Sequence, residues 1–433
     1  MAKATKSYQC WRITRAYPSK QQYEGPIMTA PLSELPDHVP ADLVRHFDLY
    51  EPIEGDDDYQ TWFTKLQAAG TPDIFWTRHN GGHWVVTRGE DFDHVLKTPE
   101  TYSSRINVVP RERLMPIVSK PIQLDPPDHT RYRNLLIPAF SPKAVVPLGE
   151  KARALTIELI EGSLARGRCE FVSEFARRLP IGIFMDMVAL PTADREQLLE
   201  WVDEMIRPTQ VDSLEAGNQL IRYAFDQLQE RRAEPGSDLL SELTRAQVGG
   251  NPLQDEELVG MFFLLLLGGL DTVAAMLSFI IRHLASHPEA RRELIEHPER
   301  IPAAAEELMR RFPISTLVRV VTRDHEYKGI NFREGDLVLM QTSAHSVDDR
   351  LFNDPLAVDF ERKVVFHGTF GSGAHRCIGS MLARVEVRVF LEEWLKRIPE
   401  FRLKPGQPLR VEPGMVLAMP RLELEWDITE SRP

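Results

Sequence analysis

The sequence contains little cysteine, and its three cysteines are widely separated. Only Cys10, Cys169 and Cys377 occur in 433 residues, and no two of them form a CxxC motif. This spacing excludes a disulfide framework and a cysteine-built zinc site as organising elements of the fold. A chain of this kind is expected in a reducing compartment, so we predict a cytoplasmic protein.

An excess of positive charge is absent as well. The chain has 52 Lys and Arg against 64 Asp and Glu, which gives a net charge of -12 at pH 7. Nucleic-acid binding normally requires an excess of clustered cations, so nucleic acid is not expected as a partner. With 42% hydrophobic and 27% charged residues, the composition is that of a soluble globular protein.

Long apolar runs are limited to one segment, VGMFFLLLLGGLDTVAAMLSFII, which spans Val259 to Ile281. It is nearly long enough to cross a bilayer. Asp271 lies at its centre, where a carboxylate is costly in lipid, and no convincing aromatic or cationic anchors bracket the run. The segment therefore predicts a helix buried in a large protein core and no membrane association.

The N-terminal residues lack the apolar core of a secretory signal. We expect residues 1–38 to form a flexible extension, part of which precedes a second possible start at Met28. No internal repeat and no low-complexity linker divides residues 39–433. These residues are predicted to form one compact catalytic domain, which we expect to be a monomer.

Helical periodicity dominates the chain, most clearly in residues 144–167, 194–206 and 214–235. Strand signals are short and occur in GGHWVVTRG near residue 85 and in YKGINFREGDLVLMQ near residue 335, where REGD is typical of a hairpin turn. The predicted fold class is therefore mainly α with a small β part. Residues 108–127 are rich in proline and have no sustained period, which favours an irregular binding loop.

One cysteine has an unusual local sequence. Cys377 lies in FGSGAHRCIG, directly before the helical pattern SMLARVEVRVFLEEWLKRI. At a helix N-terminus, unpaired N–H groups and the helix dipole lower a thiol pKa, which makes a metal ligand or a nucleophile. The neighbouring glycines let a flat or bulky group approach the backbone. A single cysteine is, however, more often a small buried hydrophobe.

The spacing around this cysteine resembles the haem-ligand signature of the cytochrome P450 family. The matching positions are Phe370, Gly371, Gly373, His375, Cys377 and Gly379. The resemblance implies the cytochrome P450 fold, a single haem-containing domain, and haem b whose iron is ligated by the thiolate of Cys377. It also implies that Phe370 and Gly379 lie against the haem.

Glu307 and Arg310, in EELMRR, lie three residues apart and can meet on one helix face. Such a pair is usually a surface salt bridge of little consequence. In the cytochrome P450 family the matching ExxR pair is buried and fixes the loop that carries the ligand cysteine. The resemblance therefore implies a structural role for both residues.

The motif GGLDT interrupts the apolar helix at Gly268. Each glycine costs a helix about 1 kcal/mol relative to alanine, so close helix packing or a need for space can explain the pair. The resemblance implies that Gly268 is a haem-binding residue and that, with the haem beneath them, Gly268 and Gly269 leave room for bound oxygen and substrate. It also implies that Asp271 and Thr272 deliver the protons that O–O bond cleavage requires.

His129 and Arg133 lie four residues apart in DPPDHTRYR. An ordinary solvated helix face can explain this spacing. In the family, the matching HxxxR segment contacts the haem propionates, which suit N–H and cationic donors. Arg319 and His375 occupy further family positions of that kind.

From about residue 39 to the C-terminus the chain resembles the bacterial camphor-hydroxylating branch of the family, with NGGHW, LLGGLDTV, EELMRRF and RIPEF. The resemblance implies electron supply by a [2Fe-2S] ferredoxin and its NADH-dependent flavoprotein reductase. Arg133, Arg384 and Arg388 are expected on the side of the protein that meets an acidic ferredoxin.

Departures from this branch concern the substrate. Ile117 stands where camphor-binding relatives have a tyrosine, Val108 replaces an expected aromatic residue, and Leu317 replaces an acidic residue near a propionate. The pocket is therefore predicted to be apolar, with Gln123 and Ser315 as polar handles. The predicted lining residues are Val108, Ile117, Ile122, Leu264, Leu267, Ser315, Met415 and Val416.

These features together predict a haem-thiolate monooxygenase that uses O2 to hydroxylate an unactivated C–H bond. The expected substrate is a small apolar molecule such as a terpenoid or norisoprenoid. A peroxide-driven peroxygenase is the enzymatic alternative, although it does not need an acid and alcohol pair. A non-enzymatic haem sensor or electron carrier is another, although it needs no apolar oxygen pocket.

Overall fold

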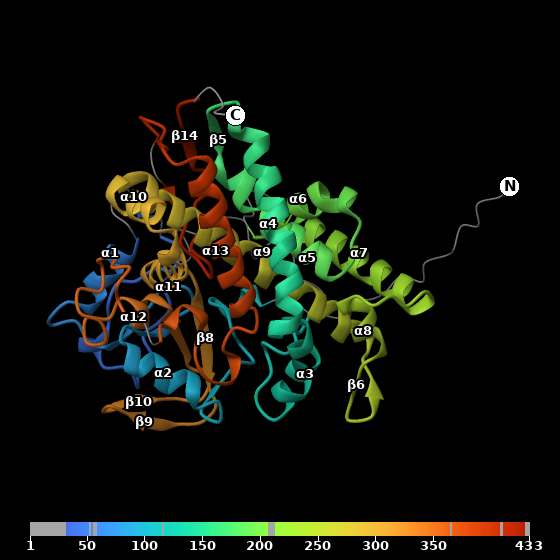
Figure 1. Ribbon diagram of the computed structural model, residues 1–433. Coiled ribbons are helices and arrows are strands. Elements are labelled where there is room, and N and C mark those ends of the chain that lie inside the picture. The colour runs from blue at the N-terminus through green and yellow to red at the C-terminus, as the bar shows by residue number, and fades with distance from the viewer. Residues whose placement is uncertain are drawn as a thin grey trace.

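The structure is a computed structural model, and it describes residues 32–51, 53–54, 59–114, 117–206, 213–363, 366–407 and 410–428. Helices form most of it. In Figure 1, α4 to α8 lie on the right of the molecule, and α2, α12 and the hairpin β9–β10 lie on the left. The α-helices are α1 (Tyr59–Thr64), α2 (Gly89–Lys97), α3 (Asp128–Leu136), α4 (Pro142–Leu164), α5 (Arg178–Met187), α6 (Arg195–Ile206), α7 (Ser213–Ala233), α8 (Leu239–Arg245), α9 (Asp255–Ser286), α10 (Pro288–Glu296), α11 (Ile301–Arg311), α12 (Ser343–Ser346) and α13 (Ser380–Arg397).

The strands form one five-stranded sheet and several small ones. The large sheet has the order β2-β3-β11-β8-β4, in which β3 and β11 are parallel and the other neighbours are antiparallel. The smaller groups are β12-β14-β5, β9-β10, β6-β7 and β1-β13. The strands are β1 (Ile53–Glu54), β2 (Ile74–Thr77), β3 (His83–Val86), β4 (Tyr102–Ser103), β5 (Arg168–Glu170), β6 (Gln247–Val248), β7 (Asn251–Pro252), β8 (Thr316–Val321), β9 (His325–Tyr327), β10 (Ile330–Phe332), β11 (Leu337–Gln341), β12 (Arg402–Leu403), β13 (Arg410–Val411) and β14 (Glu423–Glu425).

The predicted fold class is confirmed, since helices dominate and the strands are short. Both predicted strand regions contain strands, but the hairpin predicted at REGD is wrong. Arg333 to Asp336 do form a turn, yet β10 before it pairs with β9, whereas β11 after it pairs with β3 and β8. The hairpin lies one turn earlier, at Lys328 and Gly329, which both have positive φ.

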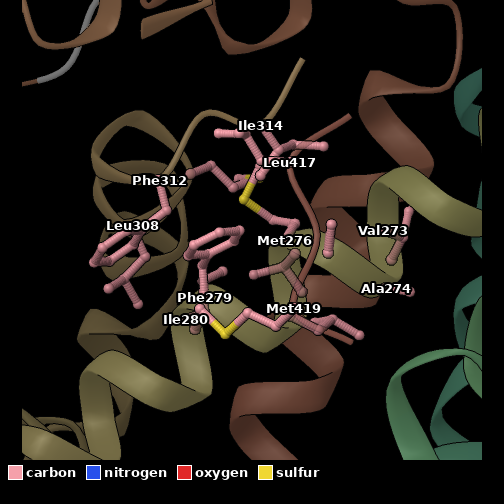
Figure 2. Close-up of a cluster of buried hydrophobic side chains, with 14 of the residues drawn as sticks. Val273, Ala274, Met276, Phe279, Ile280, Leu308, Phe312, Ile314, Leu417 and Met419 are labelled. Atoms are coloured by element: carbon pink, nitrogen blue, oxygen red, sulfur yellow. The ribbon is translucent and has the colours of Figure 1, made fainter. Parts of the chain in front are cut away.

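Helix α9 runs through the hydrophobic core. It is long and apolar enough to span a membrane, but 67% of its most apolar window is buried inside the protein. Figure 2 shows its C-terminal half, with Met276 and Phe279, packed against Phe312 after α11 and against Leu417 and Met419. Burial by protein on this scale is what a core helix requires, so the predicted core helix is confirmed.

The predicted boundary at residue 39 stays a prediction. Residues 1–31 lie outside the described residues. Ser33 donates its backbone N–H to the carbonyl of Arg78 at 2.9 Å, and His38 Nε2 lies 2.9 Å from Asp336 Oδ2. The segment from 32 to 38 is therefore bonded to the body of the domain.

Glu386 in α13 gives the fold a pH dependence. It is buried and Oε2 has no hydrogen-bond partner, and burial raises its pKa from 4.5 to about 8. Between these values the folded protein holds a proton that the unfolded chain releases, so the free energy of unfolding falls as pH rises. Glu386→Gln is expected to remove about 2 kcal/mol of this loss between pH 6 and 8, measured by urea unfolding. The control is exposed Glu326→Gln, which should follow the wild-type pH dependence; the same slope in both variants would contradict the assignment.

Candidate functional site

Backbone contacts fix the conformation of the loop that carries Cys377. The N–H of Cys377 donates to the carbonyl of Phe370 at 2.9 Å. Gly373 has a φ of 67°, and a Cβ there would lie 2.2 Å from the carbonyl oxygen of Leu96, so no side chain fits. The N–H of Gly379 donates to the thiol of Cys377 just before α13 begins. The glycines of the motif thus fix where the sulfur lies.

The surroundings of Cys377 act on its thiol in opposite directions. The residue is accessible, yet burial is the main influence on the thiol and raises its pKa. The N–H of Gly379 and the charges of Arg133, Arg384 and Arg376 lower that pKa, but by less. The predicted net lowering by the helix start is therefore wrong, because desolvation outweighs it. Desolvation disfavours a free thiolate here, and a metal cation bound to the sulfur would offset that cost.

A group of donors lies beside this loop. The rings of His129 and His375 have centroids 4.1 Å apart. Burial, and then Arg133, lowers the pKa of His129 to about 4, while burial, Arg319 and His129 lower that of His375 to about 2. Burial also lowers the pKa of Arg319 to about 10, against the charge of Asp125. The structure thus brings all four predicted propionate-binding residues together.

The donor group fits the carboxylates of a haem. Both ring nitrogens of His129 are buried without a hydrogen-bond partner, and the Arg319 guanidinium donates to the carbonyl of Val318. Among the described residues, no carboxylate forms a hydrogen bond with His129, Arg133, Arg319 or His375. Buried cations and donors without an acid are costly unless an anion binds them.

His375 already has protein partners. Its Nε2 lies 3.0 Å from Ser104 Oγ, and the ring also bonds the backbone of Leu124. These contacts orient the ring against His129. Direct propionate binding by His375 stays a prediction, whereas the unpartnered ring of His129 favours that role for His129.

The middle of α9 borders open space. A Cβ on Gly268 or Gly269 would meet no heavy atom within 4 Å, and Gly268 is exposed although most of the surrounding helix is buried. Thr272 Oγ1 donates to the carbonyl of Gly268 at 2.7 Å, which leaves the hydroxyl lone pairs free to accept. Asp271 beside it is buried. The arrangement places an acid and an alcohol at the edge of this space.

The ExxR pair is buried, which excludes a surface salt bridge. Glu307 and Arg310 have 1% and 0% of their side chains exposed, and two bonds of 2.8 Å join them. Arg310 also donates to the carbonyls of Ser346, Pro355 and Ala357, at 2.7 to 3.1 Å. The pair thus ties α11 to the irregular segment that leads to the cysteine loop.

The eight predicted pocket residues are all partly accessible. Ser315 and Val416 form an antiparallel bridge, and Thr316 N–H donates to the carbonyl of Met415 at 2.9 Å. Tyr50 bridges the segment around Met415 and the segment around Val109. Its hydroxyl donates to the carbonyl of Val109 at 2.6 Å, and its ring lies beside Gly414. Val108 therefore lies on a segment next to Met415.

The remaining pocket residues belong to α9 and the loop that covers it. A Cβ on Gly260 would lie 3.3 Å from Ile117 Cγ2, one helical turn before Leu264. Leu267 and Ile117 pack on the same hydrophobic cluster. The predicted handle Gln123 is instead used within the loop, because its Oε1 accepts the N–H of Ser119 at 2.6 Å. Within the part of the chain that the structure describes, Ile122 is partly accessible and is not among the residues packed on that cluster.

Two acids near the site escaped the sequence analysis. Asp125 accepts the Ser104 N–H at 2.8 Å and is the acid whose charge acts on Arg319. Burial opposes ionisation of Glu306, but hydrogen bonds from His367 and Arg384 lower its pKa to about 2. Asp125 stands in the quoted DPPDH motif, whereas nothing in the local sequence of Glu306 marked its partners.

The chain is similar to known proteins along most of its length. A family model described as Cytochrome P450 matches residues 197–301 and 299–427. "Probable cytochrome P450 127A1" of Sinorhizobium fredii is 33% identical over 405 residues, which cover 90% of this chain and 97% of the relative. The structures "Crystal Structure of CYP101J2" and "Crystal Structure of Cytochrome P450 CYP101C1" are 38% and 37% identical, cover 92% and 91% of this chain and 100% of each relative, and give TM-scores of 0.85 and 0.84. The chain therefore belongs to the cytochrome P450 family and is a monooxygenase that binds haem b through a cysteine thiolate.

Proposed function

We propose that the protein hydroxylates an unactivated C–H bond of a compact apolar molecule, with a terpenoid or norisoprenoid as the substrate class. The observation that supports this proposal most is the open space at Gly268 and Gly269, bordered by partly accessible apolar side chains. Apolar lining with few polar groups recognises shape and bulk rather than charge. Cytoplasmic location is part of the proposal, since the sequence has only three, widely separated cysteines, and Cys169 and Cys377 are free.

The residues have distinct proposed roles. Cys377 ligates the iron, and Phe370 and Gly379 hold the loop around it. The haem, when bound, supplies oxygen activation, to which a thiolate ligand contributes electron density. His129, Arg133, Arg319 and His375 bind or flank the propionates. All four side chains can donate N–H groups to carboxylates.

Asp271 and Thr272 are proposed to move protons. Thr272 Oγ1 is oriented by its bond to Gly268, so it can accept a hydrogen bond from an ordered water and pass a proton towards the open space. Asp271 is the acid that resupplies that proton. Proton transfer by a positioned side chain contributes roughly 100- to 10,000-fold to a rate, which is the scale of the contribution we propose for this pair.

We further propose a [2Fe-2S] ferredoxin, with an NADH-dependent flavoprotein reductase, as the electron source. Ile137, Val146 and Met381 are exposed apolar side chains on segments that pack beside the cysteine loop. Arg376 is exposed there as well. Arg384 supports docking less than expected, because Glu306 binds it with two bonds, of 2.5 and 3.1 Å.

The proposed function is tested with the wild-type protein. The reduced, CO-bound protein should show the absorption band of a thiolate-ligated haem. Terpenoids that displace water should then shift the haem spin state, and NADH, reductase, ferredoxin and isotopically labelled O2 should place one labelled atom in the product. A product formed only with peroxide would contradict the monooxygenase, and lack of any product or spin shift would contradict the substrate class.

Thr272→Ala is expected to lower the yield of product per O2 consumed by about tenfold while O2 consumption continues. The reason is that, without the Thr272 hydroxyl, protons are no longer delivered to one defined position, so O2 is reduced without forming product. The measurement is product formed against O2 and NADH consumed. Ser278→Ala is the matched control, because Ser278 Oγ makes the same type of bond to the carbonyl of Ala274, at 2.8 Å, within buried helix. Equal yields in both variants would remove Thr272 from the proton path.

A further inference from the structure

The segment from Ile117 to Leu124 lies directly on the first turns of α9. A Cβ on Gly260 would be 2.4 Å from the carbonyl oxygen of Val118, so only glycine allows this approach. Val118 itself is 48% exposed, which places the segment between solvent and the helix. Since Ile117 and Ile122 are proposed pocket residues, this segment covers the pocket.

Lys120 connects the segment to two helices. Its Nζ lies 2.6 Å from Glu257 Oε1 in α9 and donates to the hydroxyl of Tyr132 in α3 at 3.2 Å. Nζ also lies 4.5 Å from the centroid of the Tyr132 ring, a cation–π contact. Tyr132 in turn donates its hydroxyl to the same oxygen of Glu257 at 2.5 Å. Three side chains from three segments therefore meet at one carboxylate.

The Glu257 carboxylate is itself fixed by the helix. Its second oxygen accepts the N–H of Gln254 at 2.7 Å, which completes the capping box of α9. The Lys120 and Glu257 side chains are only 21% and 18% exposed. A charge-assisted bond between largely buried side chains is stronger than an exposed ion pair. Because the capping box already fixes Glu257, little further conformational entropy is lost when Lys120 binds it.

The segment is stiff within itself. The backbone N–H of Gln123 donates to the carbonyl of Ser119 at 3.1 Å, and that of Leu124 donates to Pro121 at 3.0 Å. The side-chain Oε1 of Gln123 accepts the N–H of Ser119. These bonds hold the segment in the shape that fits α9, so loss of its anchor to α9 is expected to weaken them as well.

We propose that Lys120, Glu257 and Tyr132 form a latch that holds the 117–124 segment closed over the pocket and sets the rate at which apolar molecules enter and leave. The three are positioning residues, since they act through Ile117, which packs against α9 at Gly260. The inference rests on the proposed function for the identity of the pocket. The latch itself rests on contacts between protein groups.

The first test is amide hydrogen exchange of the ligand-free, haem-containing protein. Lys120→Met keeps the length of the side chain and removes its charge. The amides of Ser119, Gln123 and Leu124 should exchange about tenfold faster, as expected when a charge-assisted bond is lost. The control is Lys404→Met, which breaks a 2.8 Å ion pair with Glu423 on the small sheet. Equal exchange of these amides in both variants would overturn the latch.

The second test follows ligand passage. Phenylimidazole, an apolar nitrogen ligand of haem iron, is mixed rapidly with each protein and the change in the haem absorption is recorded. Association and dissociation should both be about tenfold faster in Lys120→Met, with little change in affinity, because an open segment lowers the barrier in both directions. Unchanged rates would overturn the gating role. Absence of a spectral change in every variant would instead contradict the proposed function, and hydrogen exchange would still decide on the latch.

Gly260→Ala tests the latch independently, because it prevents the 117–124 segment from packing against α9 without changing Lys120, Glu257 or Tyr132. The added Cβ must push the Val118 carbonyl away from α9, while Lys120 and Glu257 are retained. Faster exchange of the three amides and faster phenylimidazole passage are expected here too, with a helix stabilised rather than weakened by the substitution. Wild-type amide exchange together with wild-type phenylimidazole rates in this variant would overturn the proposal.

Discussion

A Cys377→Ala protein is expected to lose the thiolate-haem band of its CO complex and all product formation. The substitution leaves the backbone bond from residue 377 to the Phe370 carbonyl in place, so the loop can keep its shape. Alanine supplies no ligand atom, and the iron then lacks the thiolate that drives O–O cleavage. The measurements are the reduced CO spectrum and product formation with ferredoxin and reductase.

Cys169→Ala is the matched control for this experiment. Cys169 is the other cysteine in the described residues; it is buried in β5 within the main core, and burial raises its thiol pKa. This variant should keep the CO band and product formation, with only a packing loss of the kind that small core truncations cause. A thiolate-haem band that survives in Cys377→Ala would show that another residue ligates the iron.

The sequence predicted most of the fold because its signals are local. The periodicity of residues 144–167 corresponds to α4, and the apolar run with a central Asp271 corresponds to buried α9. The family was recognisable because the short glycine-rich motif around Cys377 resembles the haem-ligand signature of the family. The family match and the similar solved structures confirm that the chain belongs to it. The roles of the individual site residues stay predictions.

Features that depend on distant partners escaped the sequence. REGD does form a turn, but only tertiary pairing decides that β11 joins β3 rather than β10. The thiol of Cys377 sits at a helix start as predicted, yet its pKa is set mainly by burial, which no local pattern reveals. Lys120 and Glu257 are 137 residues apart, and neither lies in a recognisable motif.

Arg310→Met is expected to lower the free energy of unfolding by about 3–5 kcal/mol. The substitution leaves Glu307 as a fully buried charge without its two bonds to Arg310, and it also removes the donors of the carbonyls at Ser346, Pro355 and Ala357. Arg362 still donates to Glu307 at 3.1 Å, which places the loss within this range rather than above it. The measurement is denaturant unfolding, followed by circular dichroism and by haem release.

The control has the same spacing in a different environment. Arg131 and Asp128 also lie three residues apart and 2.8 Å from each other, but 59% and 63% of their side chains are exposed. Arg131→Met should change the free energy of unfolding by about 0.5 kcal/mol or less, because water solvates the remaining charge. Haem should be lost early during unfolding of Arg310→Met, since the cysteine loop follows the segment that Arg310 holds. A loss in Arg310→Met as small as in Arg131→Met would mean that the cysteine loop does not depend on the buried pair.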